Sequence, residues 1–439
     1  MTGQSGCKTI GNVVDCSNLG LVTIPDFTSG IPNPGGIVEV NLENNNIRIL
    51  HAHAFNGIAP TTINLERNRI HNIDDNAFKA VYTSLTTLKL RNNKLTFMPA
   101  EIGKLTIIMS LDIKDNDVTE QSLDGASDNV FRQIGDTLKE FHFGGRNFAV
   151  WPNVALSHFQ KLELLDYEGG YLSFIPYGGF HGFEHTLHKF FISKTRLRQL
   201  PIGISTLEEL RELHFDDNTQ VGDFGILAQA FATTTHTNSP LLVLSLQNDG
   251  LSRFPAVLRN LVNLQELYMN RNKLWYVADN AVNLLKQSQL TKMGLSGCNL
   301  DRIPQALLQL QGLTNLDVSA NNIQSIERFD MSNHTKISLL NVSGNPLAYI
   351  STEALKDLPT LHKLDFSNTS MTQIPKAILN THALTTLNLK NCRIECTCDL
   401  TWISKQLNGT RIIFEGTCET IEKPISLYIK DRVPTCPAR

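Results

Sequence analysis

Residues 37–47 read IVEVNLENNNI, and eleven-residue segments of the same design recur until LTTLNLKNCRI at residues 384–394. Aligning them gives fifteen segments with apolar residues at the first, fourth, sixth and eleventh positions. All but two of these sixty core positions are apolar, the exceptions being Pro60 and Gln220, whereas a 41% hydrophobic composition would place about 25 there by chance. One repeating structural unit therefore accounts for most of the chain.

The ninth position of the segment carries a second signal, because it is Asn in eight segments and Cys in two. These residues are Asn45, Asn68, Asn93, Asn116, Asn218, Asn272, Asn321, Asn345, Cys298 and Cys392. An Asn side chain both donates and accepts, so a stack of them can pair backbone groups that would otherwise be buried unpaired. This pattern is typical of a leucine-rich repeat and predicts an α/β solenoid, a curved horseshoe with a parallel sheet on its concave side.

A solenoid exposes its core at both ends, so we expect a cap at each end. The predicted parts are an N-terminal cap over residues 1–36, fifteen repeats over 37–395 and a cysteine-rich C-terminal cap over 396–439. Six of the eight cysteines fall in these caps. Zinc binding is the alternative reading of those six, but the CxC at 396–398 lacks the spacing of a CxxC zinc knuckle. Cys298 and Cys392 occupy ladder positions and are expected to be free and buried.

Both caps and all fifteen repeats resemble the ectodomains of Toll and Toll-like receptors and their secreted relatives. The segments that carry the cap resemblance are VDCSNLGLVTIP at 14–25 and CTCDL at 396–400. The resemblance implies three disulfides, Cys7–Cys16, Cys396–Cys418 and Cys398–Cys436. Disulfides persist in oxidising compartments, so we expect the mature protein outside the cell, either secreted or as the ectodomain of a membrane protein. The expected partner is a protein or a lipid-like ligand, and a homodimer is possible.

Charge and motif content exclude several function classes. Lys plus Arg number 39 against 42 Asp plus Glu, and the third, fifth and seventh positions of the fifteen segments carry twelve acidic and seven basic residues. We therefore predict no nucleic-acid partner. No apolar run approaches the ~18 residues of a membrane helix, so we expect no membrane segment in this chain. Without a P-loop, GxSxG or HExxH motif, we predict no enzyme, no catalytic residue and no cofactor.

The middle of the chain departs from the repeat. Insertions lengthen the spacing between Asn116 and Arg146 and between Asn218 and Asp249. Between them the ninth position is Arg146, Gly170 and Thr195, so the ladder is expected to fail three times. Residues 141–231 also hold 16 of the 32 aromatic residues. In Toll-like receptors that recognise lipids, a central segment with a broken ladder lies beside the ligand pocket, and this segment resembles that arrangement.

Five of these aromatic residues fall at core positions, namely Phe141, Phe143, Phe148, Phe190 and Phe215. Phe191 and Tyr171 fall at outward positions, where aromatic side chains favour binding surfaces. We therefore predict a binding site in the central segment around Phe191, Tyr171, Lys189, Asp166, Glu168, His142 and His214.

The segment HGFEHTLH contains three histidines at helical spacing, His181, His185 and His188, and three imidazoles on one helix face could bind zinc. However, the next repeat begins at Leu187, so a helix should have ended before His188. Ordinary surface histidines therefore fit this segment better.

N-x-S/T acceptors occur at Asn333, Asn341, Asn368 and Asn408, about as many as chance provides, and they are the predicted glycosylation sites. Asn341 would face the concave surface.

The repeats, the caps and the central segment together predict an extracellular module that acts by noncovalent recognition through its concave face and central segment. The alternative is a secreted structural or adhesive protein that self-assembles, because a rigid solenoid is also a building block.

Overall fold

The computed structural model describes residues 6–437 except 30, 32, 126–127, 233–238, 276, 278–279, 281, 333–334 and 407–411. The chain forms two compact units. Unit 1 comprises residues 1–220 with 229–240, and unit 2 comprises residues 221–228 with 241–439. The boundary between the units falls within the second insertion, between Asn218 and Asp249.

Unit 1 is built on short strands from the N-terminal cap and the repeats. The strands are β1 (Lys8–Ile10), β2 (Val13–Asp15), β3 (Glu39–Asn41), β4 (Ile49–Leu50), β5 (Thr62–Asn64), β6 (Asn72–Ile73), β7 (Thr87–Lys89), β8 (Ser110–Asp112), β9 (Glu140–Gly144), β10 (Leu164–Glu168), β11 (Lys189–Ser193) and β12 (Glu212–Asp216). β1 pairs antiparallel with β2, and from β2 onward the main strands pair in parallel in chain order. β4 and β6 form a separate small parallel pair.

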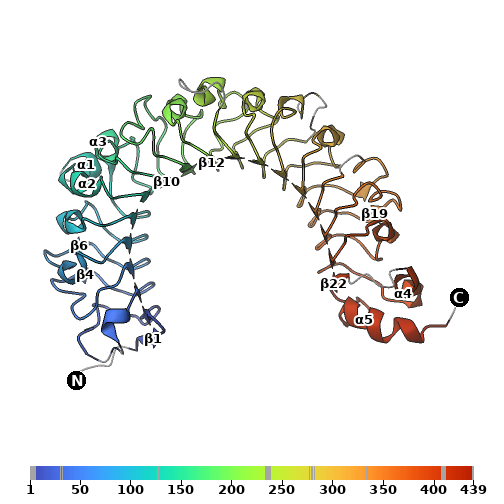
Figure 1. Ribbon diagram of the computed structural model, residues 1–439, viewed down its shortest axis with the longest axis horizontal. Coiled ribbons are helices and arrows are strands. Elements are labelled where there is room, and N and C mark those ends of the chain that lie inside the picture. Colours follow the sequence, from blue (N-terminus) through green and yellow to red (C-terminus); the bar gives the residue numbers. More distant parts are fainter. Residues whose placement is uncertain are drawn as a thin grey trace. The chain divides into compact units, whose positions relative to one another are not determined.

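Short helices lie across the core from these strands, as Figure 1 shows for α1 to α3. The helices are α1 (Glu120–Asp124), α2 (Asp128–Ile134), α3 (Asn153–Leu156) and the 3₁₀ helices η1 (Pro34–Gly36), η2 (Lys79–Val81), η3 (Ala100–Lys104) and η4 (Ile202–Thr206), while η5 (Ala228–Phe231) lies at the sequence boundary of the units. α1 and α2 occupy the first insertion, so the extra residues there fold as helices away from the sheet.

Unit 2 repeats this design and carries the second cap. Its strands are β13 (Val243–Ser245), β14 (Glu266–Tyr268), β15 (Lys292–Gly294), β16 (Asn315–Asp317), β17 (Ser325–Ile326), β18 (Leu339–Asn341), β19 (Tyr349–Ile350), β20 (Lys363–Asp365), β21 (Thr386–Asn388) and β22 (Ile413–Glu415). Its helices are α4 (Thr401–Gln406), α5 (Ile425–Asp431), η6 (Ala256–Asn260), η7 (Val282–Leu284), η8 (Gln305–Gln309), η9 (Lys376–Asn380), η10 (Cys398–Leu400) and η11 (Val433–Thr435). The main strands pair in parallel in chain order, and β17 pairs with β19.

Strand alternation decides which side chains reach the core. In β3 the side chain of Val40 is fully buried, while those of Glu39 and Asn41 are partly exposed on the other side. The same alternation holds along each strand because successive side chains point to opposite faces. The outward side, formed by the third, fifth and seventh positions of the segments, is called the strand face below.

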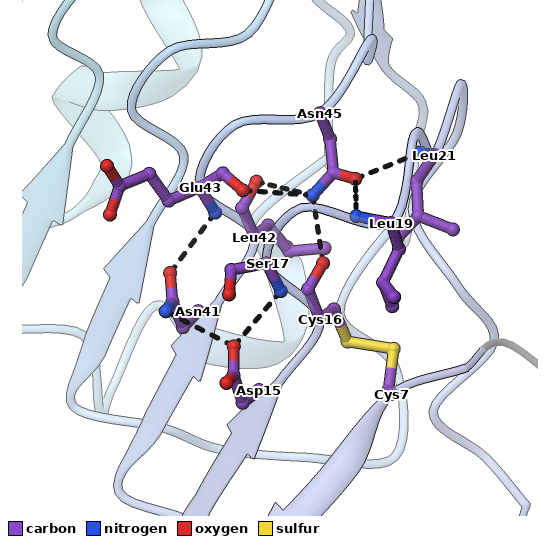
Figure 2. Close-up of a disulfide and its surroundings, with 10 residues drawn as sticks. All are labelled: Cys7, Asp15, Cys16, Ser17, Leu19, Leu21, Asn41, Leu42, Glu43 and Asn45. Carbon is purple, nitrogen blue, oxygen red and sulfur yellow. Dashed lines mark hydrogen bonds between the residues drawn. A yellow bond between two sulfur atoms is a disulfide. The ribbon is translucent and has the colours of Figure 1, made fainter.

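The Asn ladder forms as predicted, and Figure 2 shows its first rung. The Asn45 amide donates to the carbonyl oxygens of Cys16 and Leu42, both at 2.9 Å, and its oxygen accepts from the backbone N–H groups of Leu19 at 3.1 Å and Leu21 at 2.9 Å. One side chain thus pairs four backbone groups of two neighbouring turns, which prevents an unpaired-group cost of about 1 to 3 kcal/mol for each.

All three predicted disulfides are present, Cys7–Cys16, Cys396–Cys418 and Cys398–Cys436. Cys16 also fills a core position, since it is fully buried beside Val14 of β2. The caps therefore extend the sheet: β2 pairs with the strand of the first predicted repeat and β22 with that of the last. No helix in the described part of the chain is both long and apolar enough to cross a bilayer.

Cys298 and Cys392 are free and buried, as predicted. Their thiols act as ladder donors toward the carbonyl oxygens of Met269 at 3.2 Å and Phe366 at 3.1 Å. Burial raises the pKa of the Cys298 thiol to about 11, so this group stays protonated and able to donate at neutral pH.

Thr195 takes part in the ladder only as a partner of the next Asn. Its hydroxyl donates to the Asn218 side-chain oxygen at 2.6 Å and accepts from the Leu197 N–H of its own turn at 3.2 Å. Neither bond reaches the preceding turn, whose backbone a ladder Asn would pair, so Thr195 does not replace the Asn amide. Arg146 is exposed, and Gly170 has no side chain.

Many aromatic residues of the central segment are buried, and several of their rings contact one another. Phe141, Phe143, Phe148, Phe190 and Phe215 are all buried, as predicted. Phe143 contacts the ring of Tyr167 at a centroid distance of 5.0 Å, and Trp151 lies 5.7 Å from the same ring. Bulky rings thus fill the interior of the repeats in which the ladder is interrupted.

Candidate binding surface

The strands of the central segment are longer than those on either side. β9, β10, β11 and β12 each contain five residues, whereas β7 and β8 contain three. Their parallel register places the fifth positions of five successive segments in one row across the strand face, namely Asp112, His142, Asp166, Phe191 and His214. Four of the seven predicted site residues therefore lie side by side.

Phe191 is the apolar member of this row. Its neighbours Phe190 and Ile192 are fully buried, whereas Phe191 is only partly buried and faces outward, as predicted. Its ring stacks on the imidazole of His214, with centroids 4.6 Å apart and ring planes inclined by 24°. An aromatic ring held by a stacking neighbour needs little further ordering to act as a contact residue.

His214 lies between two carboxylates of its own strand. Its Nε2 is 2.9 Å from Glu212, and its Nδ1 is 3.6 Å from Asp216. Burial lowers the pKa of His214, but the hydrogen bonds and charges of Asp216 and Glu212 outweigh it, so its pKa is raised. Lys189, at 3.0 Å from Glu212, joins the same group.

Asp166 forms polar contacts with two neighbouring side chains in the other half of the row. It accepts from Lys114 Nζ at 2.6 Å and lies 2.8 Å from His142 Nδ1. Burial raises the pKa of Asp166, but the hydrogen bond with His142 and the charge of Lys114 outweigh this effect, so its pKa is lowered. Asp166 is therefore ionised at neutral pH.

Glu168, two residues along β10, collects three cations: Lys194 Nζ at 2.6 Å, Arg91 at 3.2 Å and Lys114 at 3.6 Å. Arg91 and Lys114 reach Glu168 across β9 because the intervening residue at this position is Gly144, which has no side chain. Gly144 has φ +119°, and an added Cβ would stand 2.4 Å from the Glu168 carbonyl oxygen. Gly144 thus makes room for a charge network.

Tyr171 does not join the other six predicted residues. It follows the Gly169–Gly170 turn beyond the end of β10, is 53% exposed, and has the Arg196 guanidinium 4.1 Å from its ring centroid. The expectation of one surface that contains both Phe191 and Tyr171 is therefore corrected. Both glycines have positive φ, and this turn carries the chain off the strand face.

Four participants in the network were not predicted, namely Arg91, Asp112, Lys114 and Lys194. Arg91, Asp112 and Lys114 occupy fifth or seventh positions of neighbouring segments, so the repeat pattern contains the signal that would identify them, whereas Lys194 directly follows β11 at an eighth position. The pKa of Asp112 is raised mainly by burial, and the pKa of Glu66 is raised by burial and by the charge of Asp112.

The other predicted sites are scattered. His181 pairs with Glu184 and His185 with Glu208, both at 2.9 Å, in turns rather than on a helix. Within the described residues no group of three or more His, Cys, Asp or Glu is placed to hold a metal ion. Asn341 lies in β18 on the strand face of unit 2, Asn368 is exposed, and Asn333 and Asn408 lie outside the described residues.

Comparison with known proteins identifies the repeat. The family model "Leucine rich repeat" matches residues 61–118, 288–347 and 335–394. Podocan from Mus musculus is 25% identical over 402 residues, which cover 85% of this chain and 62% of podocan. The volume-regulated anion channel subunit LRRC8A from Homo sapiens is 27% identical over 194 residues, covering 44% of this chain and 23% of that protein. The chain thus spans less than two thirds of the length of these relatives.

One solved structure shares the fold. TLR13 in its complex with ssRNA13 superposes with a TM-score of 0.50 at 17% identity, covering 90% of this chain and 72% of that one. A chain of the octameric complex of Latrophilin 3, Unc5D and FLRT2 gives a TM-score of 0.46 at 16% identity, covering 95% of this chain. None of these matches is to a catalytic family.

Proposed function

We propose that this leucine-rich-repeat protein acts outside the cell as a noncovalent recognition module, and that the strand face of unit 1 around Phe191 binds a protein partner. The observation that carries the proposal is the row on β9 to β12, in which Phe191 stacks on His214 and the surrounding side chains are held by ion pairs. An aromatic anchor within an ordered polar surround is the usual arrangement of a binding hot spot.

The charge of this surface indicates the partner's chemistry. On the strand face of unit 1, nine acidic residues stand against four basic ones: Glu39, Glu43, Glu66, Asp112, Glu140, Asp166, Glu168, Glu212 and Asp216 against Lys89, Arg91, Lys114 and Lys189. The same positions of unit 2 carry three of each sign. The net charge of −5 on the strand face therefore comes entirely from its positions in unit 1. A basic surface of a partner protein complements this charge, whereas a phosphate backbone does not.

Asp112 and Glu66 favour the same conclusion. Their pKa values are raised, for Asp112 by burial and for Glu66 by burial together with the charge of Asp112, and the surrounding cations do not offset these effects. A cationic side chain from a partner would oppose these effects. Because charged groups surround Phe191, a protein partner fits this surface better than a lipid.

The disulfides support the extracellular part of the proposal, because three bridges with both ladder thiols free fit an oxidising exterior. Glycosylation at Asn341 and Asn368 is part of the proposal. Both residues lie in unit 2.

A random peptide library selected against the folded protein tests the proposal. Peptides that bind the wild type but not Phe191→Ala should be enriched in Lys and Arg beside an apolar residue. Selection of acidic peptides, or of none that depend on Phe191, would contradict the proposed surface. Concentration-dependent self-association without peptide binding would favour the alternative, a secreted self-assembling protein.

A further inference from the structure

Exposed aromatic residues cluster on a second surface of unit 1. Tyr171, Phe174 and Tyr177 are 53%, 64% and 58% exposed and fall within seven consecutive residues after β10. Large apolar side chains so exposed and so close together are unusual on a soluble protein and mark interaction sites. They lie in the loop beyond the strand, so they do not contribute to the row that contains Phe191.

A groove of about 240 Å³ lies between this loop and the corresponding loop of the next repeat. Phe174 and Tyr177 line one side together with Ile175, and Leu197, Pro201 and Ile202 line the other. Its walls are mostly apolar, with Ser173 and Gln199 as the polar lining residues, and its volume is below the roughly 300 to 1,000 Å³ typical of small-molecule pockets. A single apolar side chain therefore fits it better than a lipid chain or a cofactor.

The groove is held in shape from below. The indole N–H of buried Trp151 donates to the Gly179 carbonyl at 2.7 Å, which fixes the end of the aromatic loop. On the opposite wall, a Cβ added to Gly203 would stand 2.6 Å from the Tyr177 carbonyl oxygen, so the two loops are in close contact. A preformed groove loses little conformational freedom when an anchor enters it.

Two exposed arginines flank the groove residue Leu197 in the sequence. Arg196 precedes Leu197 and lies over the Tyr171 ring, and Arg198 follows Leu197. Within the described residues neither arginine forms an ion pair with a carboxylate. The residues on both sides of Leu197 thus carry positive charge, opposite to the net charge of the strand face.

An equivalent groove in unit 2 provides an internal comparison. It has the same volume, about 240 Å³, and is lined by Trp275, Val277, Leu300 and Pro304, but Asp301 and Arg302 stand in its wall. Arg302 is paired with Asp330 at 2.8 Å. A groove between successive loops is therefore a general product of the repeat, whereas the mostly apolar walls and unpaired arginines distinguish the groove at Phe174.

We propose that the groove between Phe174 and Leu197 is a second binding site, independent of the strand face, and that it takes an apolar side chain of a partner protein segment whose flanking residues are acidic. The apolar side chain enters between Phe174 and Tyr177. The acidic residues meet Arg196 and Arg198, where charge complementarity selects them.

Defined peptides test this site. The probes are fluorescein-labelled Asp-Asp-Phe-Leu-Asp-Asp, its lysine counterpart Lys-Lys-Phe-Leu-Lys-Lys, and Asp-Asp-Ala-Ala-Asp-Asp, titrated with the full chain by fluorescence anisotropy. We expect only the first peptide to bind. Phe174→Ala and Arg198→Gln should each weaken it by about tenfold or more. Phe191→Ala on the strand face and Trp275→Ala in the comparison groove should leave its affinity unchanged.

Phe174 and Arg198 are exposed, so both variants should fold, which thermal unfolding checks. The proposal is overturned if the acidic apolar peptide does not bind, if the lysine peptide binds equally well, or if neither substitution changes affinity. It is also overturned if Phe174→Ala instead abolishes a concentration-dependent dimer seen by sedimentation, because the occupant would then be a second copy of the chain.

Discussion

The ring of Phe191 stacks on the imidazole of His214 from the neighbouring strand, with centroids 4.6 Å apart. This contact joins the apolar centre of the proposed surface to a group that can change its charge near neutral pH. Binding and stability are therefore linked at one pair of residues.

The titration of His214 should make part of the protein's stability depend on pH. Its folded pKa is raised above the ordinary value of 6.5 by Asp216 and Glu212, against the effect of burial. Such a group contributes stability that is fully present below the unfolded pKa and is lost as the pH rises through the folded pKa. The free energy of unfolding of the wild type should therefore exceed that of His214→Gln by more at pH 5.5 than at pH 9. Urea unfolding at both pH values measures it, with exposed His185→Gln as the control, and an unchanged difference would contradict the assigned environment.

Replacing Tyr167 with phenylalanine should stabilise the folded protein. Its hydroxyl is buried and has no hydrogen-bond partner among the residues that the structure describes. A buried unpaired hydroxyl costs about 1 to 3 kcal/mol, so Tyr167→Phe should raise the free energy of unfolding by roughly 1 kcal/mol. Tyr82→Phe is the matched control and should lower it, because the Tyr82 hydroxyl donates to the buried carboxylate of Glu101. A loss of stability in Tyr167→Phe would reveal a partner such as ordered water.

Gly144→Ala should disturb the charge network of β10. Its φ of +119° and the 2.4 Å approach to the Glu168 carbonyl leave no place for a Cβ, so we expect a loss of more than about 1 kcal/mol in unfolding free energy. Gly178→Ala is the control, since nothing lies within 4 Å of its added Cβ. Equal, small losses in both variants would mean that Gly144 is not required for the strand spacing.

Nucleic acid should not bind. The unit 1 strand face carries five more acidic than basic residues in the positions counted above, and phosphate contacts need clustered cations. Fluorescence anisotropy with a labelled single-stranded RNA at physiological salt should show no binding. Micromolar, salt-sensitive affinity would overturn the charge argument.

The fold could be predicted because each structural role is tied to a fixed position in the repeated segment. Val40 and Leu42 had to be buried, Asn45 had to pair backbone groups, and the cap cysteines followed the pattern of a known family. The cap strand β2 was missed because Cys16 occupies the core position that follows it and hides the repeat. The bond of Thr195 to Asn218 was not foreseen because it joins two side chains of neighbouring turns.

The candidate site could be predicted only in part. A position in the segment indicates whether a side chain points inward or outward, but it does not indicate which side chains it contacts. The outward position of Phe191 was predictable, while its stacking on His214 required the register of β11 and β12. Arg91 reaches Glu168, 77 residues later, only because Gly144 leaves the path open. Tyr171 was assigned to the wrong surface because the double-glycine turn directs it away from the strand row.

Titration of one peptide selected against the strand face, measured by calorimetry, tests the central claim most directly. The proteins compared are wild type, Phe191→Ala and Asn388→Ala, the last in β21 of unit 2, with thermal unfolding run alongside. We predict that Phe191→Ala loses about 2 kcal/mol of binding free energy or more, roughly thirtyfold in affinity, while it unfolds near the wild-type temperature and Asn388→Ala binds normally. Equal, small effects of both substitutions, or a large loss of stability in Phe191→Ala, would contradict the account.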